Sequence, residues 1–201
     1  MSRYRPLSDI DTLVIHCAGT PNGEPVAALT IDKWHYKRGF RRALEARLGE
    51  GPWAHPPYAL HQPYLRAIGY HFVIAVNGSV SNGRRLTETG AHAIDPRYPK
   101  KDPKRGRPNR RGIGICLIGT DRFSREQWDS LAKLVSGLRQ RKEFTIRTLI
   151  GHRDLSPDTN HNGRADPHEW IKLCPGFEVR DWVKGDLKPL AKHTLYTKEQ
   201  K

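Results

Sequence analysis

Short apolar runs that alternate with segments of helical spacing are the feature that most constrains the fold of this chain. Four of these runs predict strands, at residues 12–16, 70–76, 113–118 and 146–150. Asn77-Gly78 follows the second run and predicts a hairpin whose return begins at Ser79. Strands that alternate with helices around one core predict a single α/β domain with a central mixed β-sheet flanked by helices.

Two helices are expected between these strands. Thr30 is a suitable N-cap for a helix that carries Trp34 and His35. Ser124, with Gln127 three residues further on, has the pattern of a capping box. The apolar residues that follow recur at helical spacing and predict one face that packs on the sheet: Trp128, Leu131, Leu134, Val135 and Leu138.

The single domain is expected to span residues 1–201, with its core at about 10–185. Prolines interspersed with aromatic residues predict an irregular insertion at about 41–66. A run of lysine and arginine broken by prolines predicts a mobile basic loop at about 96–111, which is either solvated or a docking arm for an anionic polymer. A basic tail is expected at about 184–201.

Charge and hydropathy limit the classes of partner. No stretch approaches the ~20 apolar residues that a membrane-spanning helix needs, and residues 1–6 lack the apolar core of a secretory signal. We therefore expect synthesis in the cytoplasm without a signal peptide. We also expect the protein to be a monomer. The net charge of +14 favours a polyanion, which could be nucleic acid, anionic lipid or the bacterial cell wall. No helix-turn-helix, zinc-finger spacing or basic-aromatic motif predicts a specific nucleic-acid partner.

Two histidines and one cysteine form the strongest chemical pattern. His16 ends the first apolar run, His152 follows the last one, and Cys174 lies in a proline-glycine turn. Two imidazoles and a thiolate are a zinc set that leaves one coordination position open, where hydrolysis can take place. The alternative for Cys174 is an ordinary loop thiol. Cys17 and Cys116 lie inside apolar runs and are expected to be buried and inert.

Seven short motifs occur in order along residues 12–182. They are Val14-Ile15-His16-Cys17, Trp34-His35, Gly69-Tyr70-His71-Phe72, Gly90-Ala91-His92-Ala93, Asn109 with Ile113-Gly114-Ile115-Cys116-Leu117-Ile118-Gly119, Gly151-His152-Arg153 and Lys172-Leu173-Cys174-Pro175-Gly176-Phe177. With them the chain resembles the zinc-dependent N-acetylmuramoyl-L-alanine amidases of the phage lysozyme type, which are related to the peptidoglycan-recognition proteins. The resemblance implies a surface zinc groove and a peptidoglycan hydrolase. Its zinc-activated water would cleave the amide between N-acetylmuramic acid and L-alanine of the stem peptide.

The resemblance also implies roles for single residues. It implies zinc ligands at His16, His152 and Cys174. It implies catalytic residues at Tyr70 and Lys172, and substrate contacts at His92 and Asn109. An ammonium at Lys172 and a phenol at Tyr70 are suited to the negative charge that develops on the amide oxygen. Tyr70 is the first choice for the proton relay, but the division of that task with Lys172 stays open. Without the resemblance, Tyr70 would be expected as a half-buried aromatic residue and Lys172 as an exposed lysine.

A second metal is suggested by the segment 158–169, which has oxygen side chains and a glycine in the pattern of a twelve-residue calcium loop. Its predicted ligands are Asp158, Asn160, Asn162, the backbone of Arg164, Asp166 and Glu169. A bound calcium ion would rigidify the chain between His152 and Cys174. Clusters of aspartate, asparagine and glycine also form plain turns, so both alternatives stay open.

Three biological settings are compatible with these residues. The leading one is a phage or prophage endolysin, made in the cytoplasm and released through the membrane to cut the cell wall. A cytosolic amidase that recycles muropeptides is a close variant. A non-catalytic peptidoglycan-binding module would keep the groove and lose the metal, and the joint presence of two histidines, a cysteine, a tyrosine and a lysine at the matching positions argues against it.

Overall fold

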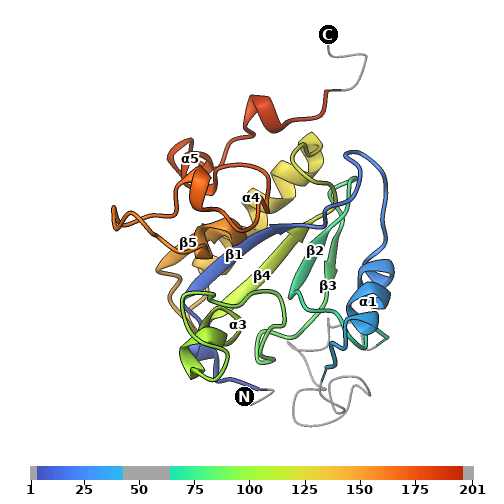
Figure 1. Cartoon of the computed structure of the whole chain (residues 1–201). Helices are drawn as coiled ribbons and strands as arrows, with labels where there is room; N and C mark the ends of the chain where they lie inside the picture. Colours follow the sequence, from blue (N-terminus) through green and yellow to red (C-terminus); the bar gives the residue numbers. More distant parts are fainter. Residues whose placement is uncertain (1–3, 43–63, 197–201) are drawn as a thin grey trace.

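The four apolar runs and the predicted hairpin form one five-stranded sheet (Figure 1). The computed structural model describes residues 4–42 and 64–196. The strands are β1 Thr12–Cys17, β2 Phe72–Ile74, β3 Val80–Asn82, β4 Gly112–Leu117 and β5 Thr148–Gly151. They lie in the order β3-β2-β4-β1-β5, with β3 antiparallel to β2 and all other neighbours parallel. The predicted α/β fold with a mixed sheet is confirmed.

Helices lie on both sides of this sheet. Those described are α1 Ala28–Lys37, α3 Arg107–Arg111, α4 Arg125–Arg139 and α5 Val179–Lys184. Short 3-10 segments are η1 Leu7–Asp9, η3 Pro103–Gly106, η4 His152–Leu155, η5 Pro167–Glu169 and η6 Ala191–His193. Among the helices in the described part of the chain, none is long and apolar enough to cross a lipid bilayer.

Helix α4 covers one face of the sheet, as its sequence predicts (Figure 1). Its buried residues share a core with side chains of β1 and β4: Trp128, Leu131, Val135 and Leu138 with Leu13, Ile15, Ile113, Ile115 and Leu117. Each fully buried side chain of this size contributes roughly 1.5–3 kcal/mol. The capping box is confirmed, because Ser124 Oγ accepts from the Gln127 N–H at 3.1 Å and Gln127 Oε1 accepts from the Ser124 N–H at 3.0 Å.

The alternation of side chains along β1 directs His16 away from α4. Successive residues of a strand point to opposite faces. Leu13 and Ile15 pack in the α4 core, so His16 projects to the other face, beside its β4 partner Cys116. Cys116 packs there in a second core with Ile31 of α1. This second face carries the candidate site.

Several element boundaries differ from those predicted, and those of α1 and β2 bear on the site. Helix α1 begins at Ala28, with Ala27 rather than Thr30 at the N-cap, because alanine is a strong helix former and extends the helix backward. Strand β2 is shorter than residues 70–76, and Tyr70 lies just before it. Most of the irregular insertion predicted at 41–66 lies outside the described residues, as do the last residues of the basic tail.

The basic segment 96–111 is only partly irregular, because its second half folds into η3 and α3. Pro103 and Pro108 lie in the first turns of these helices, where a missing N–H and a fixed φ are favourable. Asp102 accepts from the Lys104 N–H at 2.8 Å and caps η3. Prolines that suggested irregular structure in the sequence therefore start helices here.

Candidate metal centre

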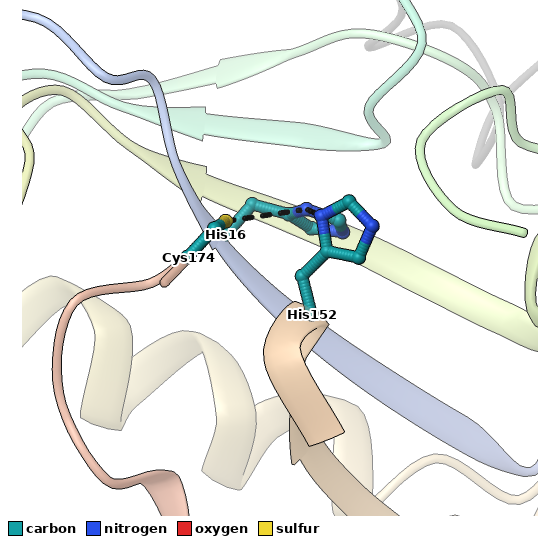
Figure 2. A group of neighbouring side chains, drawn as sticks. All are labelled: His16, His152 and Cys174. Carbon is teal, nitrogen blue, oxygen red and sulfur yellow. Dashed lines mark hydrogen bonds between the residues drawn. The ribbon is translucent and has the colours of Figure 1, made fainter. Parts of the chain in front are cut away.

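His16, His152 and Cys174 come from three separate elements and converge on one point (Figure 2). His16 lies near the end of β1, His152 is the first residue of η4 directly after β5, and Cys174 lies in the loop before α5. Because β1 and β5 are parallel neighbours, their carboxyl ends lie at the same edge of the sheet. This pairing brings together two histidines that are far apart in the sequence.

The separations of the three side chains match one metal ion. His16 Nδ1 lies 3.1 Å from His152 Nδ1 and 3.8 Å from Cys174 Sγ. Ordinary zinc bond lengths in a tetrahedral site place two nitrogens about 3.3 Å apart and a nitrogen and a sulfur about 3.6 Å apart. Within the described ranges, these three residues form a group of potential metal ligands, and their ligand atoms all lie within 4.8 Å of one another. The donor set therefore fits zinc with its fourth position open.

Close backbone contacts hold Cys174 against the two histidines. The N–H of Arg153 donates to the Cys174 carbonyl at 2.8 Å, and the N–H of Cys17 donates to Cys174 Sγ at 3.2 Å. Gly151 permits this approach, since a Cβ there would lie 2.8 Å from Cδ of Pro175. The absence of a side chain at Gly151 therefore allows the loop that carries Cys174 to pack against the end of β5.

Burial keeps the imidazoles in the neutral form that binds metals. It lowers the pKa of His152 to about 4, with a further contribution from the Lys172 ammonium, and lowers the pKa of His16 well below its usual value. The adjoining Cys17 thiol and burial together raise the pKa of the Cys174 thiol. A cation is therefore needed to stabilise the Cys174 thiolate.

His92 lies directly behind His16. His16 Nε2 is 3.0 Å from His92 Nδ1, and both imidazoles are buried. Asn109 Oδ1 accepts from the N–H groups of His92 and Ala93 at 2.8 and 2.9 Å. The two residues that were predicted as substrate contacts thus also make contacts within the protein next to a candidate ligand.

The three candidate ligands lie beside an open cavity of about 700 Å³. Tyr70 and Lys172 line it together with His152 and Cys174, and the Tyr70 ring centroid lies 5.1 Å from that of His16. Burial raises the pKa of Tyr70 well above its usual value, so its phenol stays protonated at neutral pH. The structure therefore brings every residue predicted for the zinc site to one place.

Other residues at the cavity were not predicted as part of the site. They are Cys17, Ala18, Gly19, His35, Arg38, Phe40, Ala91, Ala93, Ile94 and Leu173. Cys116 is fully buried as expected, but Cys17 is only half-buried because β1 ends there and the strand no longer covers it. Leu173 is 70% exposed and Ile94 is 46% exposed, so apolar side chains stand at the rim. Five of them, Cys17, His35, Ala91, Ala93 and Leu173, lie inside the ordered motifs, which was their only sequence signal.

The calcium prediction for segment 158–169 is not supported. The carboxylate of Glu169 accepts from the N–H groups of Thr159, Asn160 and Asp166. The side-chain amide nitrogens of Asn160 and Asn162 both donate to Asp166, which also pairs with Arg164. Asp158, the first of the predicted ligands, accepts from the N–H groups of residues 162 and 163. The oxygen atoms thus organise a turn by binding its own donors.

A His-His-Cys group beside an open cavity, at the carboxyl end of a parallel strand, is the arrangement expected of a single-metal hydrolase. The sequence profile of the N-acetylmuramoyl-L-alanine amidases matches residues 6–169. The chain belongs to this family of peptidoglycan amidases and is an enzyme of this class.

Individual proteins are also similar to this chain in sequence. An uncharacterised protein of Haemophilus influenzae is 36% identical over 119 residues, which cover 55% of this chain and 90% of that protein. The endolysin of Enterobacteria phage T3 is 24% identical over 90% of this chain and 89% of its own length.

Solved structures show the same fold. The amidase LysCS of Clostridium intestinale, described as an endolysin, superposes with a TM-score of 0.56 at 21% identity, over 93% of this chain and 90% of that one. Peptidoglycan recognition protein-LE, in complex with a monomeric diaminopimelic acid-type peptidoglycan, has a TM-score of 0.54 at 15% identity, over 91% and 85% of the two chains.

Proposed function

We propose that this protein is a phage-type endolysin that hydrolyses the amide between N-acetylmuramic acid and the L-alanine of the stem peptide. The observation that carries the proposal is the convergence of His16, His152 and Cys174 at 3.1 and 3.8 Å beside an open cavity. We assign these three residues as zinc ligands. Bound zinc would supply Lewis acidity, which makes water nucleophilic near neutral pH and polarises the amide carbonyl.

Lys172 is assigned to the amide oxygen. It is exposed at the cavity, two residues before Cys174, and its charge reaches both candidate histidine ligands electrostatically. Attack on the amide carbon places negative charge on the oxygen, and a nearby ammonium stabilises that charge. The exposed position leaves the side chain free to follow the substrate into the cavity.

Tyr70 is assigned as a hydrogen-bond donor rather than as a base. Burial raises the pKa of its phenol, so the proton stays on Oη at the pH of the reaction. A protonated phenol beside His16 can donate to the substrate oxygen or hold the attacking water by a hydrogen bond. This assignment makes Tyr70 a donor and not a base, and it places the positive charge that stabilises the amide oxygen on Lys172.

We propose cytoplasmic synthesis followed by release through the membrane onto the cell wall, because endolysins of phages T3 and T7 match this chain over most of its length. We expect the protein to act as a monomer, with peptidoglycan as its partner. The net charge of +14 favours association with acidic wall polymers, and that association weakens as salt rises.

Mass spectrometry of digested peptidoglycan tests the proposal. The native protein should release stem peptides with a free L-alanine amino terminus, whereas chelated protein and the Cys174→Ser and Lys172→Gln variants should release none above background. Lys133→Gln, on the exposed side of α4, is a matched control that should digest like the native protein. New reducing sugar ends would contradict amidase chemistry, and binding without any cleavage would favour a recognition module.

A further inference from the structure

The imidazole of His92 lies behind the candidate ligand His16, on the side away from the metal position. His16 Nε2 and His92 Nδ1 are 3.0 Å apart, and His16 Nδ1 faces His152 and Cys174. His16 is 0% exposed and His92 is 9% exposed. Each nitrogen of the His16 ring therefore has a different and specific neighbour.

This arrangement determines which nitrogen of His16 must carry the proton. A neutral imidazole has one N–H and one lone pair, and only the lone pair binds a metal. If Nδ1 binds the metal, the proton is on Nε2, and Nε2 needs an acceptor because it is buried. His92 Nδ1 is that acceptor, so the proton of His92 is on its own Nε2, a buried atom that has no hydrogen-bond partner among the described residues.

The surrounding backbone is shaped to keep His92 in this position. A Cβ at Gly114 would lie 2.5 Å from both Cγ and Cδ2 of His92, and a Cβ at Gly90 would lie 2.5 Å from Cδ2. The two glycines therefore leave space that the imidazole fills. Asn109 holds the main chain at the same point through the N–H groups of His92 and Ala93.

We propose that His92 is a positioning residue for the metal centre, which fixes His16 with its proton on Nε2 and its Nδ1 lone pair toward His152 and Cys174. The inference rests on the proposed function, because it takes His16 as a zinc ligand. It assigns His92 and Asn109 a structural role next to the metal centre, in place of the direct substrate contact that the sequence suggested.

Loss of the His92 acceptor favours a competing arrangement. Without it, the His16 proton is better placed on Nδ1, where it can be donated to His152 Nδ1 at 3.1 Å. That hydrogen bond must break before a metal can bind. Partners that orient a ligating histidine typically contribute about 10- to 100-fold to metal affinity.

Zinc affinity, measured by competition with a chromophoric chelator, tests the proposal without an activity assay. His92→Leu keeps a similar volume but has no acceptor, so its zinc dissociation constant should rise by about 10- to 100-fold. His92→Asn places Oδ1 close to the original Nδ1 position and should restore affinity to within a few-fold of native. Gly90→Ala pushes the imidazole away without removing it, and it should weaken zinc binding even if His92→Leu fails to fold.

His71→Asn is the matched control. His71 is also fully buried, and its Nδ1 accepts from the Gly114 N–H at 3.0 Å, but it does not contact a candidate ligand. Its zinc affinity should be native. Proton-nitrogen correlation spectra of the zinc-loaded native protein should show the His16 proton on Nε2.

The outcomes distinguish a failure of the proposed function from a failure of the positioning role of His92. Native protein that binds no zinc would remove the proposed function itself. Zinc binding by the native protein together with equal affinity in His92→Leu would overturn the positioning role alone. Equal losses in His92→Leu and His92→Asn, or in His71→Asn, would also overturn it, since the effect would then be steric and not due to the acceptor.

Discussion

Arg42 and Glu88 form a buried ion pair that ties the chain after α1 to the loop that leads to His92. Arg42 Nε and Nη2 donate to the two Glu88 carboxylate oxygens at 3.0 and 2.6 Å, and Arg42 Nη1 donates to the Leu65 carbonyl at 2.8 Å. The two side chains are 0% and 1% exposed. Arg42→Met retains much of the side-chain volume but leaves the Glu88 carboxylate buried without its counter-ion.

The expected cost follows from these contacts. Removal of one partner of a buried pair costs about 3–5 kcal/mol, and we expect about 4 kcal/mol because the Leu65 carbonyl loses its donor as well. With an unfolding entropy of about 2.1 cal/mol/K per residue, this loss lowers the melting temperature by about 10 °C. The double variant Arg42→Met/Glu88→Gln removes the uncompensated charge and should recover part of the loss.

Urea denaturation followed by circular dichroism measures these differences on the metal-free proteins. Arg110→Met is the control, because the Arg110–Asp9 pair is 44% and 28% exposed and should contribute less than about 1 kcal/mol. A cost of less than about 1 kcal/mol for Arg42→Met, or a double variant less stable than the single one, would contradict a stabilising role of the buried pair.

Three further predictions concern the site. Lys172→Gln should lower kcat by about 10²–10³-fold with native zinc content, because one stabilising donor is lost; a normal kcat would exclude the assigned role. Tyr70→Phe should lower kcat similarly, again with zinc retained, and a loss confined to KM would indicate substrate binding instead. Burial lowers the pKa of His152 to about 4 and of His92 to about 3, from an ordinary value of 6.5, so the unfolded chain binds more protons below pH 6.5. Chelated protein should therefore melt at progressively lower temperature as the pH falls from 6.5 through 4, and a constant melting temperature over that range would argue against neutral buried histidines.

The strand pattern and the ordered motifs made the fold and the zinc cluster predictable. An apolar run that ends in His16 and another that ends just before His152 place both side chains at strand ends. Parallel pairing of β1 and β5 then brings them together. Cys174 could be added because it lies in a proline-glycine turn and completes a zinc donor set with two histidines, and because its motif resembles that of a known family.

The contact between His92 and His16 could not be predicted in the same way. These residues are 76 positions apart, and the loop that carries His92 has no periodic pattern that fixes its path. Its position depends on two glycines that leave room for the ring. In the sequence Gly114 is a glycine within a predicted strand and Gly90 lies outside the predicted elements, and neither position indicates a space for an imidazole.

Two segments show why composition misleads. The oxygen side chains of 158–169 and the prolines of 96–111 each suit two structures, and neighbouring donors decide between them. In the first segment the N–H groups of the loop occupy the carboxylate of Glu169. In the second, a cap at Asp102 and a proline in the first turn allow a helix to start.

X-ray absorption at the zinc edge of the purified protein measures whether His16, His152 and Cys174 hold zinc. We expect one zinc per chain, with one sulfur at about 2.3 Å and two imidazole nitrogens at about 2.0 Å, and loss of the sulfur signal in Cys174→Ser. A native protein without stoichiometric zinc, or a zinc shell without sulfur, would contradict this assignment.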